Sequence, residues 1–265
     1  MYVKQPGLLV ASANAPIVGY ENFVTSSIVS TTTQNSLYPR SNLANHSTHL
    51  VWKGTSSVAD EDIVLTFSGG QELDYIAIAE HNFGTEAISV AVSGATDGVP
   101  TYATLATGIL QSDDAPLLVR FAKATYTHIR IRLSPGSGPP QAAVVYAGRI
   151  MELPRNIYVG HTPITLGKRN RIVVGRSESG AFLGRVTTGQ GNETSVAMKN
   201  LEPAWYRNFM KPFTDAAESS PFFFGWRPGT YPDEIGYAWL TSDPIPVNER
   251  SNGMMSVELQ MSGVV

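Results

Sequence analysis

The stretch IAIAEHNFGTEAISVAVSG, residues 76–94, decides how the first half of the chain folds. Apolar residues alternate with small ones on both sides of its centre, which is typical of β-strands. The centre, EHNFGTE (80–86), places His81 and Asn82 among carboxylates and next to a glycine. Residues of these types suit a metal site, a general base, a sugar pocket or a turn.

Strand geometry favours the turn. Neighbouring residues of a strand point to opposite faces, so Glu80 and His81 are expected on different sides of a sheet. Asn82 and Gly84 both tolerate left-handed backbone angles, which suit a chain reversal. We expect this stretch to join two strands of a sandwich, with His81 and Asn82 bonding locally. A sugar contact at these two residues stays open as the alternative.

Strand patterns of the same kind surround this stretch. Ile129, Ile131 and Leu133 alternate with Arg130 and Arg132, as in a half-buried strand. Short strands spaced by about 12 residues predict an antiparallel β-sandwich or jelly roll. We place it at residues 30–150, after an N-terminal arm of residues 1–29. The strands are expected at 62–69, 74–81, 87–94, 115–121, 127–134 and 142–153.

The pattern changes near residue 151, where Pro154 ends a strand and longer strands follow. We therefore expect a second β domain at residues 151–265. Within it, residues 170–190 predict a hairpin that turns at RSESG (176–180). A second turn is expected at TGQGNE (188–193), because glycines and polar residues cluster there.

One segment, residues 202–218, predicts a helix. Asn200 is a candidate N-cap, and Glu202 and Pro203 suit the first turn. Trp205, Phe209 and Phe213 recur every four residues and predict one apolar stripe, which Tyr206 and Met210 widen. Pro212 is expected to kink the helix or to remove one of its backbone hydrogen bonds.

Composition excludes several classes of protein. The chain has 265 residues, 15% of them charged, a net charge of −3 and no cysteine. Disulfides, thiol catalysis and cysteine-based zinc sites are therefore excluded. The bulk charge does not predict specific nucleic-acid binding. No apolar run approaches the roughly 18 residues of a membrane span, and we read the N-terminus as mature sequence.

Local groups of polar residues do not assemble into a catalytic set. His46 and His49 are spaced H-x-x-H outside any predicted helix, and ADED (59–62) lacks an EF-hand pattern. Neither a G-x-S-x-G motif nor a phosphate-binding loop is present. We expect no enzyme, no metal and no cofactor. A hydrolase would need a carboxylate pair that nothing in the sequence singles out.

Trp52 leaves two interpretations open. It covers the sandwich core like a lid, or it forms a platform on which a sugar stacks. In the second case Trp52, His81, Asn82 and Tyr126 are the candidate glycan contacts.

A resemblance to a known family rests on these motifs taken in order. YPRSNLANHSTHLVW (38–52), a strand ending in HNFG (81–84) and AISVAVSG (87–94) resemble a galactose-binding-like, discoidin-type jelly roll. The version they resemble occurs in tail-tip proteins of long, flexible-tailed bacteriophages. The hairpin, the amphipathic helix and PFFFGW (221–226) resemble the tail-tube-like fold of distal tail proteins.

The resemblance implies a virion structural protein of the tail tip, or baseplate, assembled in the host cytoplasm. Copies of the second domain would form a ring, hexameric in the family, that continues the tail tube. Its partners would be the tail tube protein, the hub and the tape-measure protein. The alternative is a carbohydrate-binding module that contacts glycans on the host surface.

The resemblance also has a departure. In better-known distal tail proteins the ring domain comes first, whereas here the order is reversed, so the position within the tail tip stays open. The hairpin 170–190 and VAMKNLEPAWYRNFM (196–210) are the expected surface between subunits. The residues expected there are Trp205, Tyr206, Arg207, Arg176 and Arg185.

Overall fold

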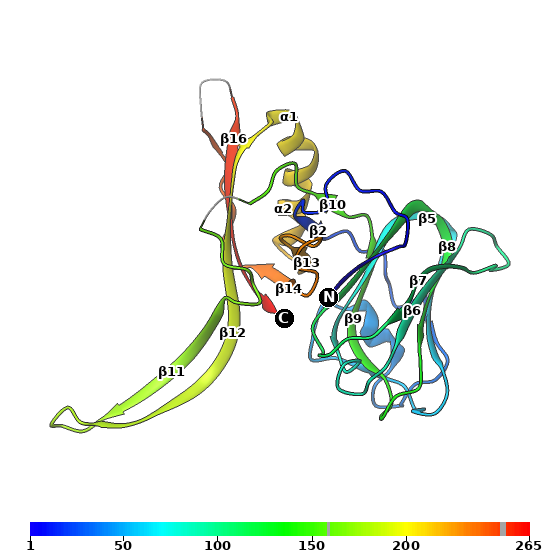
Figure 1. The fold of residues 1–265 in the computed structure, drawn as a ribbon, viewed down its shortest axis with the longest axis horizontal. Coiled ribbons are helices and arrows are strands. Elements are labelled where there is room, and N and C mark those ends of the chain that lie inside the picture. The colour runs from blue at the N-terminus through cyan, green and yellow to red at the C-terminus, as the bar shows by residue number, and fades with distance from the viewer. Residues whose placement is uncertain (158–159, 250–252) are drawn as a thin grey trace.

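The computed structural model describes residues 1–157, 160–249 and 253–265. The chain is mostly β, with one helical segment, and the predicted fold class is confirmed. Figure 1 shows a β-sandwich at the right, a second sheet with the helix beside it, and a long hairpin projecting at the lower left.

Two long strands, β5 (Glu61–His81) and β8 (Leu117–Leu133), pair with each other and run through both layers of the sandwich. Each was expected as two shorter strands. The bend of β5 lies at Gly69 and Gly70, whose φ angles are +80° and +79°, values that glycine adopts without strain.

Each layer of the sandwich combines one half of β5 with one half of β8. In one layer they carry β3 (Val29–Thr31), β6 (Val90–Ala95) and β7 (Ala103–Ile109). In the other they carry β1 (Tyr2–Lys4), β4 (Trp52–Lys53) and β9 (Gln141–Gly148). A short 3-10 helix, Arg40–Ala44, precedes β4.

The second sheet runs in the order β10-β2-β13-β14-β16-β12-β11. Its strands are antiparallel, and β15 adds to β16. The bounds are β2 Ile17–Gly19, β10 Met151–Glu152, β11 Lys168–Arg176, β12 Phe182–Leu201, β13 Phe222–Gly225, β14 Ile235–Leu240, β15 Val247–Asn248 and β16 Met255–Val264.

Residues 1–29 do not form the separate arm that was expected. Strand β1 pairs in parallel with β8 of the sandwich, while β2 pairs with β13 and β10 of the second sheet. The first thirty residues therefore contribute to both halves of the fold.

Sandwich and second sheet share a buried layer of side chains. Tyr75 and Tyr146 from the sandwich meet Phe223 and Tyr237 from the second sheet, and all four are at most 1% exposed. The neighbours of Tyr75 on β5, such as Ile76, face the sandwich core instead. The second half of β5, from Tyr75 to Ala79, is thus covered on both faces, which accounts for its continuous apolar sequence.

The predicted helix spans α1 (Pro203–Trp205), a π-helical turn (Tyr206–Met210) and α2 (Lys211–Ala217). It begins after Glu202, not after the expected Asn200, and Pro203 is its first residue. The amide of Lys211 donates to the carbonyl of Tyr206, five residues earlier. This wider turn ends just before Pro212, which has no amide hydrogen to donate.

The predicted stripe is buried in part: Tyr206, Met210 and Phe213 face the core, whereas Phe209 does not. Ala217 also faces the core. Phe209 is 50% exposed and Trp205 is half-buried, stacked on Phe209. A π-helical turn holds more residues than an α-turn, so it shifts the helical phase that spacing alone predicts.

Candidate functional site

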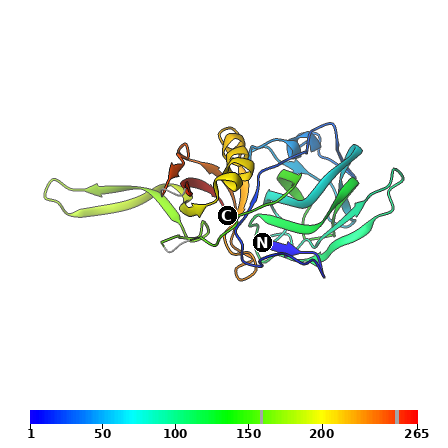
Figure 2. The ribbon, with the colours of Figure 1, turned by 90° about the horizontal axis from the view of Figure 1, so that it is seen from above.

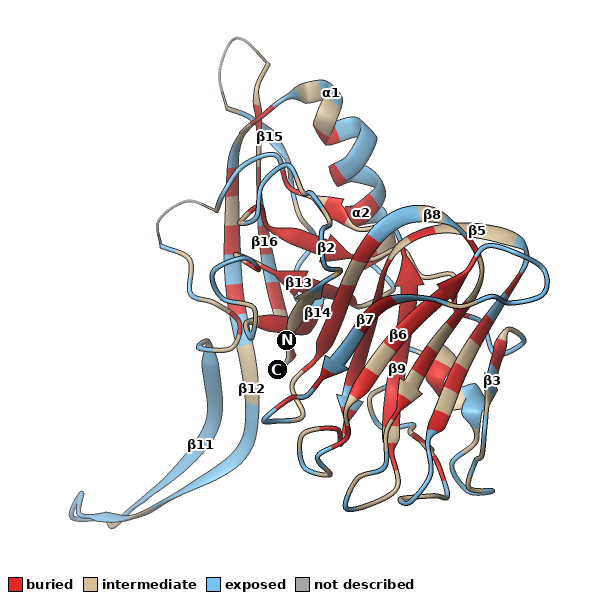
Figure 3. Ribbon diagram, turned by 45° about the vertical axis from the view of Figure 1, so that its right-hand side comes forward, coloured by how far each residue is buried: buried red, intermediate tan, exposed pale blue. Residues whose placement is uncertain are grey.

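The projecting hairpin, residues 168–191, consists of β11 and the first half of β12. The second half of β12 pairs with β16 in the body of the second sheet, from Asn192 to Leu201. Figure 2 shows the hairpin extending away from the rest of the molecule, and Figure 3 shows exposed residues along both of its strands. The hairpin and its turn at 177–180 were predicted. TGQGNE is not a turn but continuous strand.

Both edges of the projecting hairpin are free. Within the described parts of the chain, β11 pairs with β12 alone, and β12 from Phe182 to Gly191 pairs with β11 alone. Each edge therefore offers a row of backbone donors and acceptors to another strand. A two-stranded hairpin without a covered face is at best marginally stable in water.

One face of the hairpin continues the core-facing side of the second sheet. On β12, Val196 and Met198 are buried toward the helix, and Asn192 points the same way, donating to the Ile164 carbonyl at 2.7 Å. Alternation along the ladder then defines this core-side face of the hairpin. Its residues are Lys168, Asn170, Ile172, Val174 and Arg176 of β11 and Phe182, Arg185, Thr187 and Gln190 of β12.

The core-side face carries apolar side chains that the described residues leave partly or mostly exposed. Ile172, Val174 and Phe182 are 38%, 47% and 69% exposed. The helix that covers the same side of the sheet packs against its body, as Figure 3 shows, and does not reach the hairpin. Strand alternation in KRNRIVVGR (168–176) was the signal that could have identified Ile172 and Val174 from sequence.

The hairpin is also cationic. Lys168, Arg169, Arg171, Arg176 and Arg185 are all exposed, and Arg169 pairs with Glu193 at 3.2 Å. Among the residues expected between subunits, Arg176 and Arg185 lie on the core-side face, and Arg207 is exposed on the helix. Tyr206 is only 5% exposed and packs in the core, so it is not part of a surface.

The EHNFGTE stretch forms the expected connection between β5 and β6, through different backbone angles. Left-handed φ angles occur at Glu80 (53°) and Ala87 (52°), not at Asn82 or Gly84. Gly84 is required for close packing, because a Cβ there would lie 2.1 Å from the carbonyl oxygen of Asp113. Asn82 donates to the Pro139 carbonyl at 3.0 Å and accepts from the Gln141 amide at 2.8 Å.

His81 is an interior residue. It is 5% exposed, stacks on Phe83 with ring centroids 4.3 Å apart, and accepts at Nδ1 from the Phe83 amide at 3.3 Å. Burial lowers the pKa of His81 to about 4, so the ring is neutral near pH 7. With Nδ1 accepting, Nε2 carries the proton, and within the described residues it makes no hydrogen bond of normal geometry, although the ring interacts with the backbone of Ala115.

The other candidate glycan contacts are likewise interior. Trp52 is fully buried and donates from Nε1 to the Thr33 carbonyl at 3.2 Å, so it covers the core as a lid. Tyr126 is 5% exposed and donates to the Ala122 carbonyl at 2.9 Å. Trp52 and His81 both flank Ala142 of β9, whereas Tyr126 lies at the bend of β8. These rings offer no surface on which a sugar could stack.

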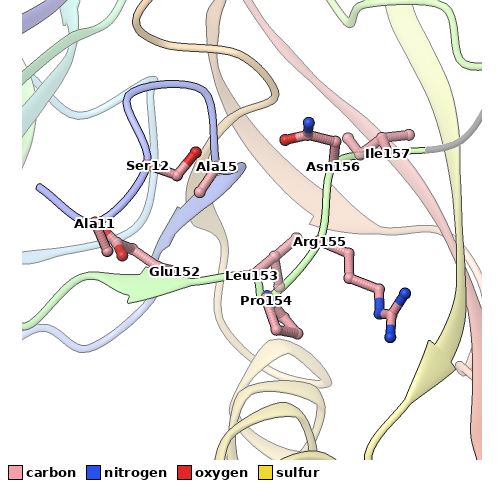
Figure 4. A pocket seen from close by; sticks show the side chains of 9 residues that line it. All are labelled: Ala11, Ser12, Ala15, Glu152, Leu153, Pro154, Arg155, Asn156 and Ile157. Atoms are coloured by element: carbon pink, nitrogen blue, oxygen red, sulfur yellow. The ribbon is translucent and has the colours of Figure 1, made fainter.

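His46 and a cavity beside residues 11–15 are two further candidate sites. His46 bonds to Tyr146, and no group of three metal-ligating side chains occurs among the described residues. None of the described helices has the length and apolar character needed to cross a membrane. A cavity of about 780 Å³ lies between Ala11–Ala15 and residues 152–157. In Figure 4 the guanidinium of Arg155 points away from Ala11 and Ser12, so the cavity gathers no polar cluster.

No family model and no curated protein matches this chain. Solved structures that resemble it include a chitosan-binding module of a chitosanase/glucanase from Paenibacillus sp. IK-5, at 13% identity and a TM-score of 0.43. That match covers 48% of this chain and 98% of the module.

A family 32 module of NanJ from Clostridium perfringens, in complex with galactose, is 13% identical with a TM-score of 0.41. It matches over 51% of this chain and 99% of its own. A further C. perfringens family 32 module, in complex with GalNAc-β-1,3-galactose, is 12% identical with a TM-score of 0.40, over 45% of this chain and 93% of its own. Likeness at this level transfers no ligand or activity to the chain.

Proposed function

We propose that this chain is a structural subunit whose copies join through the projecting hairpin into a ring. The observation that carries the proposal is the hairpin itself, exposed on both faces and free at both edges. Such a segment gains stability when another chain covers it.

The two free edges belong to different strands, β11 and β12. A contact between the β11 edge of one copy and the β12 edge of the next is therefore head to tail. Head-to-tail contacts close into a ring when the rotation between copies permits, and a closed barrel of strands has no free edge. The core-side face, with Ile172, Val174 and Phe182, would then be covered by a neighbour.

The biological setting is proposed from the sequence motifs. A ring of this kind suits the tail tip of a long-tailed bacteriophage, where it would extend the tail tube and join the hub. The hexameric count, the tube, hub and tape-measure partners and the location in the virion belong to this proposal. The sandwich would lie outside the ring, where it is free to make further contacts.

The test is the oligomeric state of the purified protein. Light scattering after size-exclusion chromatography and negative-stain imaging are expected to find rings. The double substitution Ile172→Ser and Phe182→Ser is expected to yield monomers whose unfolding free energy in dilute solution stays within about 1 kcal/mol of that of the separate wild-type monomer. Leu37→Ser and Val58→Ser, at residues 80% and 86% exposed on the sandwich, are the matched control and should still form rings. A wild type that stays monomeric at every concentration would contradict the proposal.

Carbohydrate binding by the sandwich is the second candidate function. It is favoured by the polar outer face, where the guanidinium of Arg130 lies 4.1 Å from the centroid of the half-buried Tyr102 ring. Arg130 Nε donates to the Ser93 hydroxyl at 3.2 Å, and Arg132 forms two hydrogen bonds with Asp62. An aromatic ring among polar groups with directed hydrogen bonds is the chemistry that sugar sites use.

Galactose and GalNAc-β-1,3-galactose serve as the sugars in a first binding test. Calorimetry with these sugars is expected to give binding that Tyr102→Ala removes. Tyr38→Ala, on another exposed aromatic residue of the sandwich, is the control. Absence of heat at millimolar sugar would reject this second candidate.

A further inference from the structure

A hollow of about 530 Å³ lies where the sandwich meets the second sheet. Five carboxylates line it, from β5, the loop before β8 and the loop before β14. They are Glu80, Asp113, Asp114, Asp233 and Glu234. No lysine or arginine lines the hollow.

The hollow is not neutralised from within. Asp114 accepts hydrogen bonds from Thr85, and Glu234 accepts from Trp226, both neutral donors. Glu80 and Asp233 are exposed, and no ion pair involves either within the described part of the chain. Burial lowers the pKa of the nearby Met1 amine to about 6, so it carries little charge at pH 7.

A buried donor also lines the hollow. His81 is 5% exposed, and within the described residues its Nε2, which carries the ring proton, makes no hydrogen bond of normal geometry; the ring interacts with the backbone of Ala115, which also lines the hollow. A buried donor of this kind favours a ligand that supplies an acceptor oxygen. A ligand with positive charges and carbonyl oxygens fits both observations, and a peptide segment that carries arginines has both.

The projecting hairpin has the complementary chemistry. Its five exposed cations include Arg176 and Arg185, which share the core-side face with Val174 and Phe182. In Figures 1 and 2 the hairpin leads away from the sandwich, so it cannot fill the hollow of its own chain. Opposite charges on two distant surfaces of one chain suit a contact between copies.

We infer that the hairpin of one copy docks at the acidic hollow of the next, with Arg176 and Arg185 facing Glu80 and Asp233. The inference rests on the proposed ring and adds the surface that receives the hairpin. The contact is heterologous, because the hairpin and the acidic hollow are different surfaces. Each copy can therefore use its hairpin on one neighbour and its hollow on the other, and the contact can repeat around a ring. Charge attraction of this kind weakens as salt rises.

Charge reversal in two separate proteins tests the contact. One carries Arg176→Glu and Arg185→Glu, and the other carries Glu80→Lys and Asp233→Lys. Each alone is expected to need at least about tenfold more protein for half-association than the wild type. An equimolar mixture should return to within about threefold of the wild type, because each reversed patch meets an opposite charge on its neighbour.

The control reverses two exposed acidic residues outside the hollow, Glu218→Lys and Asp243→Lys, and should associate like the wild type. A second measurement uses the absence of native cysteine: Arg176→Cys mixed with Asp233→Cys should form an intermolecular disulfide. If the Glu80→Lys and Asp233→Lys protein still forms rings, the docking of the hairpin at the hollow is wrong, while the proposal that the chain forms a ring still stands. A mixture that stays dissociated also overturns this docking. A monomeric wild type rejects the ring and this contact together.

Discussion

The hydroxyl of Tyr146 lies 2.6 Å from Nδ1 of His46, in the layer where the sandwich meets the second sheet. The same hydroxyl donates to the carbonyl oxygen of Pro221 at 2.9 Å. The hydroxyl of Tyr146 has one proton, which it donates to Pro221. In the second hydrogen bond Nδ1 of His46 is therefore protonated and donates to the hydroxyl oxygen. Segments 100 and 75 residues away in sequence thus converge on one atom.

Tyr146→Phe is expected to lower the free energy of unfolding by about 1–3 kcal/mol, because it leaves the Pro221 carbonyl and the His46 ring without a partner. Urea denaturation measures this change. Tyr38→Phe, on a ring 40% exposed, is the matched control and should leave stability within about 0.5 kcal/mol of the wild type. Equal stability of the two variants would mean that this network does not hold the two halves together.

Gly84→Ala is expected to destabilise the chain by about 1–3 kcal/mol or more, because the new methyl group would overlap the Asp113 carbonyl. Gly98→Ala is the control, since a Cβ there meets nothing within 4 Å and its φ is not left-handed. Thermal unfolding of both variants distinguishes them. A Gly84→Ala protein as stable as the control would show that the turn moves easily away from Asp113.

The sequence predicts the strands and the hairpin because their signals are local. Alternation at Ile129, Ile131 and Leu133 is a property of neighbouring residues, and these residues do face the sandwich core. By contrast, the burial of Trp52 and His81 depends on strand β9, which comes more than sixty residues later. Trp52 and His81 were candidate glycan contacts because of their residue types. Their burial results from tertiary packing, which local sequence does not show.

Two further differences have the same origin. The π-helical turn before Pro212 shifts the buried face of the helix, and single-sequence spacing assumes one regular period. Residues 1–29 give one strand to each sheet, and no local signal states which sheet a three-residue strand joins. The hairpin itself was predicted because exposed strands keep their local pattern without long-range partners, and its role between subunits stays a prediction.

Asp74 is expected to make stability fall as pH rises from about 4 to about 6. Burial raises the pKa of its carboxyl from 3.8 to about 6, although the carboxylate accepts from the Ile150 amide at 2.7 Å. The folded state therefore holds the proton more tightly than the unfolded chain, and its contribution is full below pH 3.8 and lost as pH approaches 6.

Asp74→Asn keeps an acceptor for the Ile150 amide and stays neutral at every pH. Its unfolding free energy relative to the wild type is expected to rise between pH 4 and pH 7, by at most about 3 kcal/mol. Urea denaturation across this range measures the difference. Asp243→Asn, the same substitution at an exposed aspartate, is the control. A difference between Asp74→Asn and the wild type that is constant with pH would contradict the raised pKa.

His81 is expected to act in the opposite sense. Its folded pKa of about 4 lies below the ordinary value of 6.5, so its contribution is full above pH 6.5 and lost as pH falls to about 4. His81→Gln loses the stacking on Phe83 at pH 7 and should be less stable there. Its deficit is expected to shrink as pH falls, by at most about 3 kcal/mol, because the variant has no ring to protonate.

The pH ranges over which Asp74 and His81 change stability overlap, and this overlap decides how the His81 experiment is designed. Wild-type stability alone would not separate the two groups between pH 4 and pH 6, since the contributions of Asp74 and His81 change in opposite directions there. Each variant is therefore compared with the wild type at the same pH. His128→Gln, at a half-buried histidine on the outer face of the sandwich, is the control for histidine loss. A deficit of His81→Gln that grows on acidification would contradict a neutral buried ring.

Strand β12 permits a comparison of its two halves with one chemical change. Val196 is fully buried in the body and Val186 is 64% exposed on the hairpin. Val196→Thr is expected to cost about 1–3 kcal/mol, because it places a hydroxyl in an apolar core. Val186→Thr should leave the monomer within about 0.5 kcal/mol of the wild type, because its hydroxyl stays in water. Urea denaturation in dilute solution, where the copies are separate, measures the unfolding free energy of both variants. The same measurement at high protein concentration adds the contribution of assembly.

If Val186→Thr destabilised the dilute monomer as much as Val196→Thr, the hairpin would be covered within a single chain and unavailable to a neighbour.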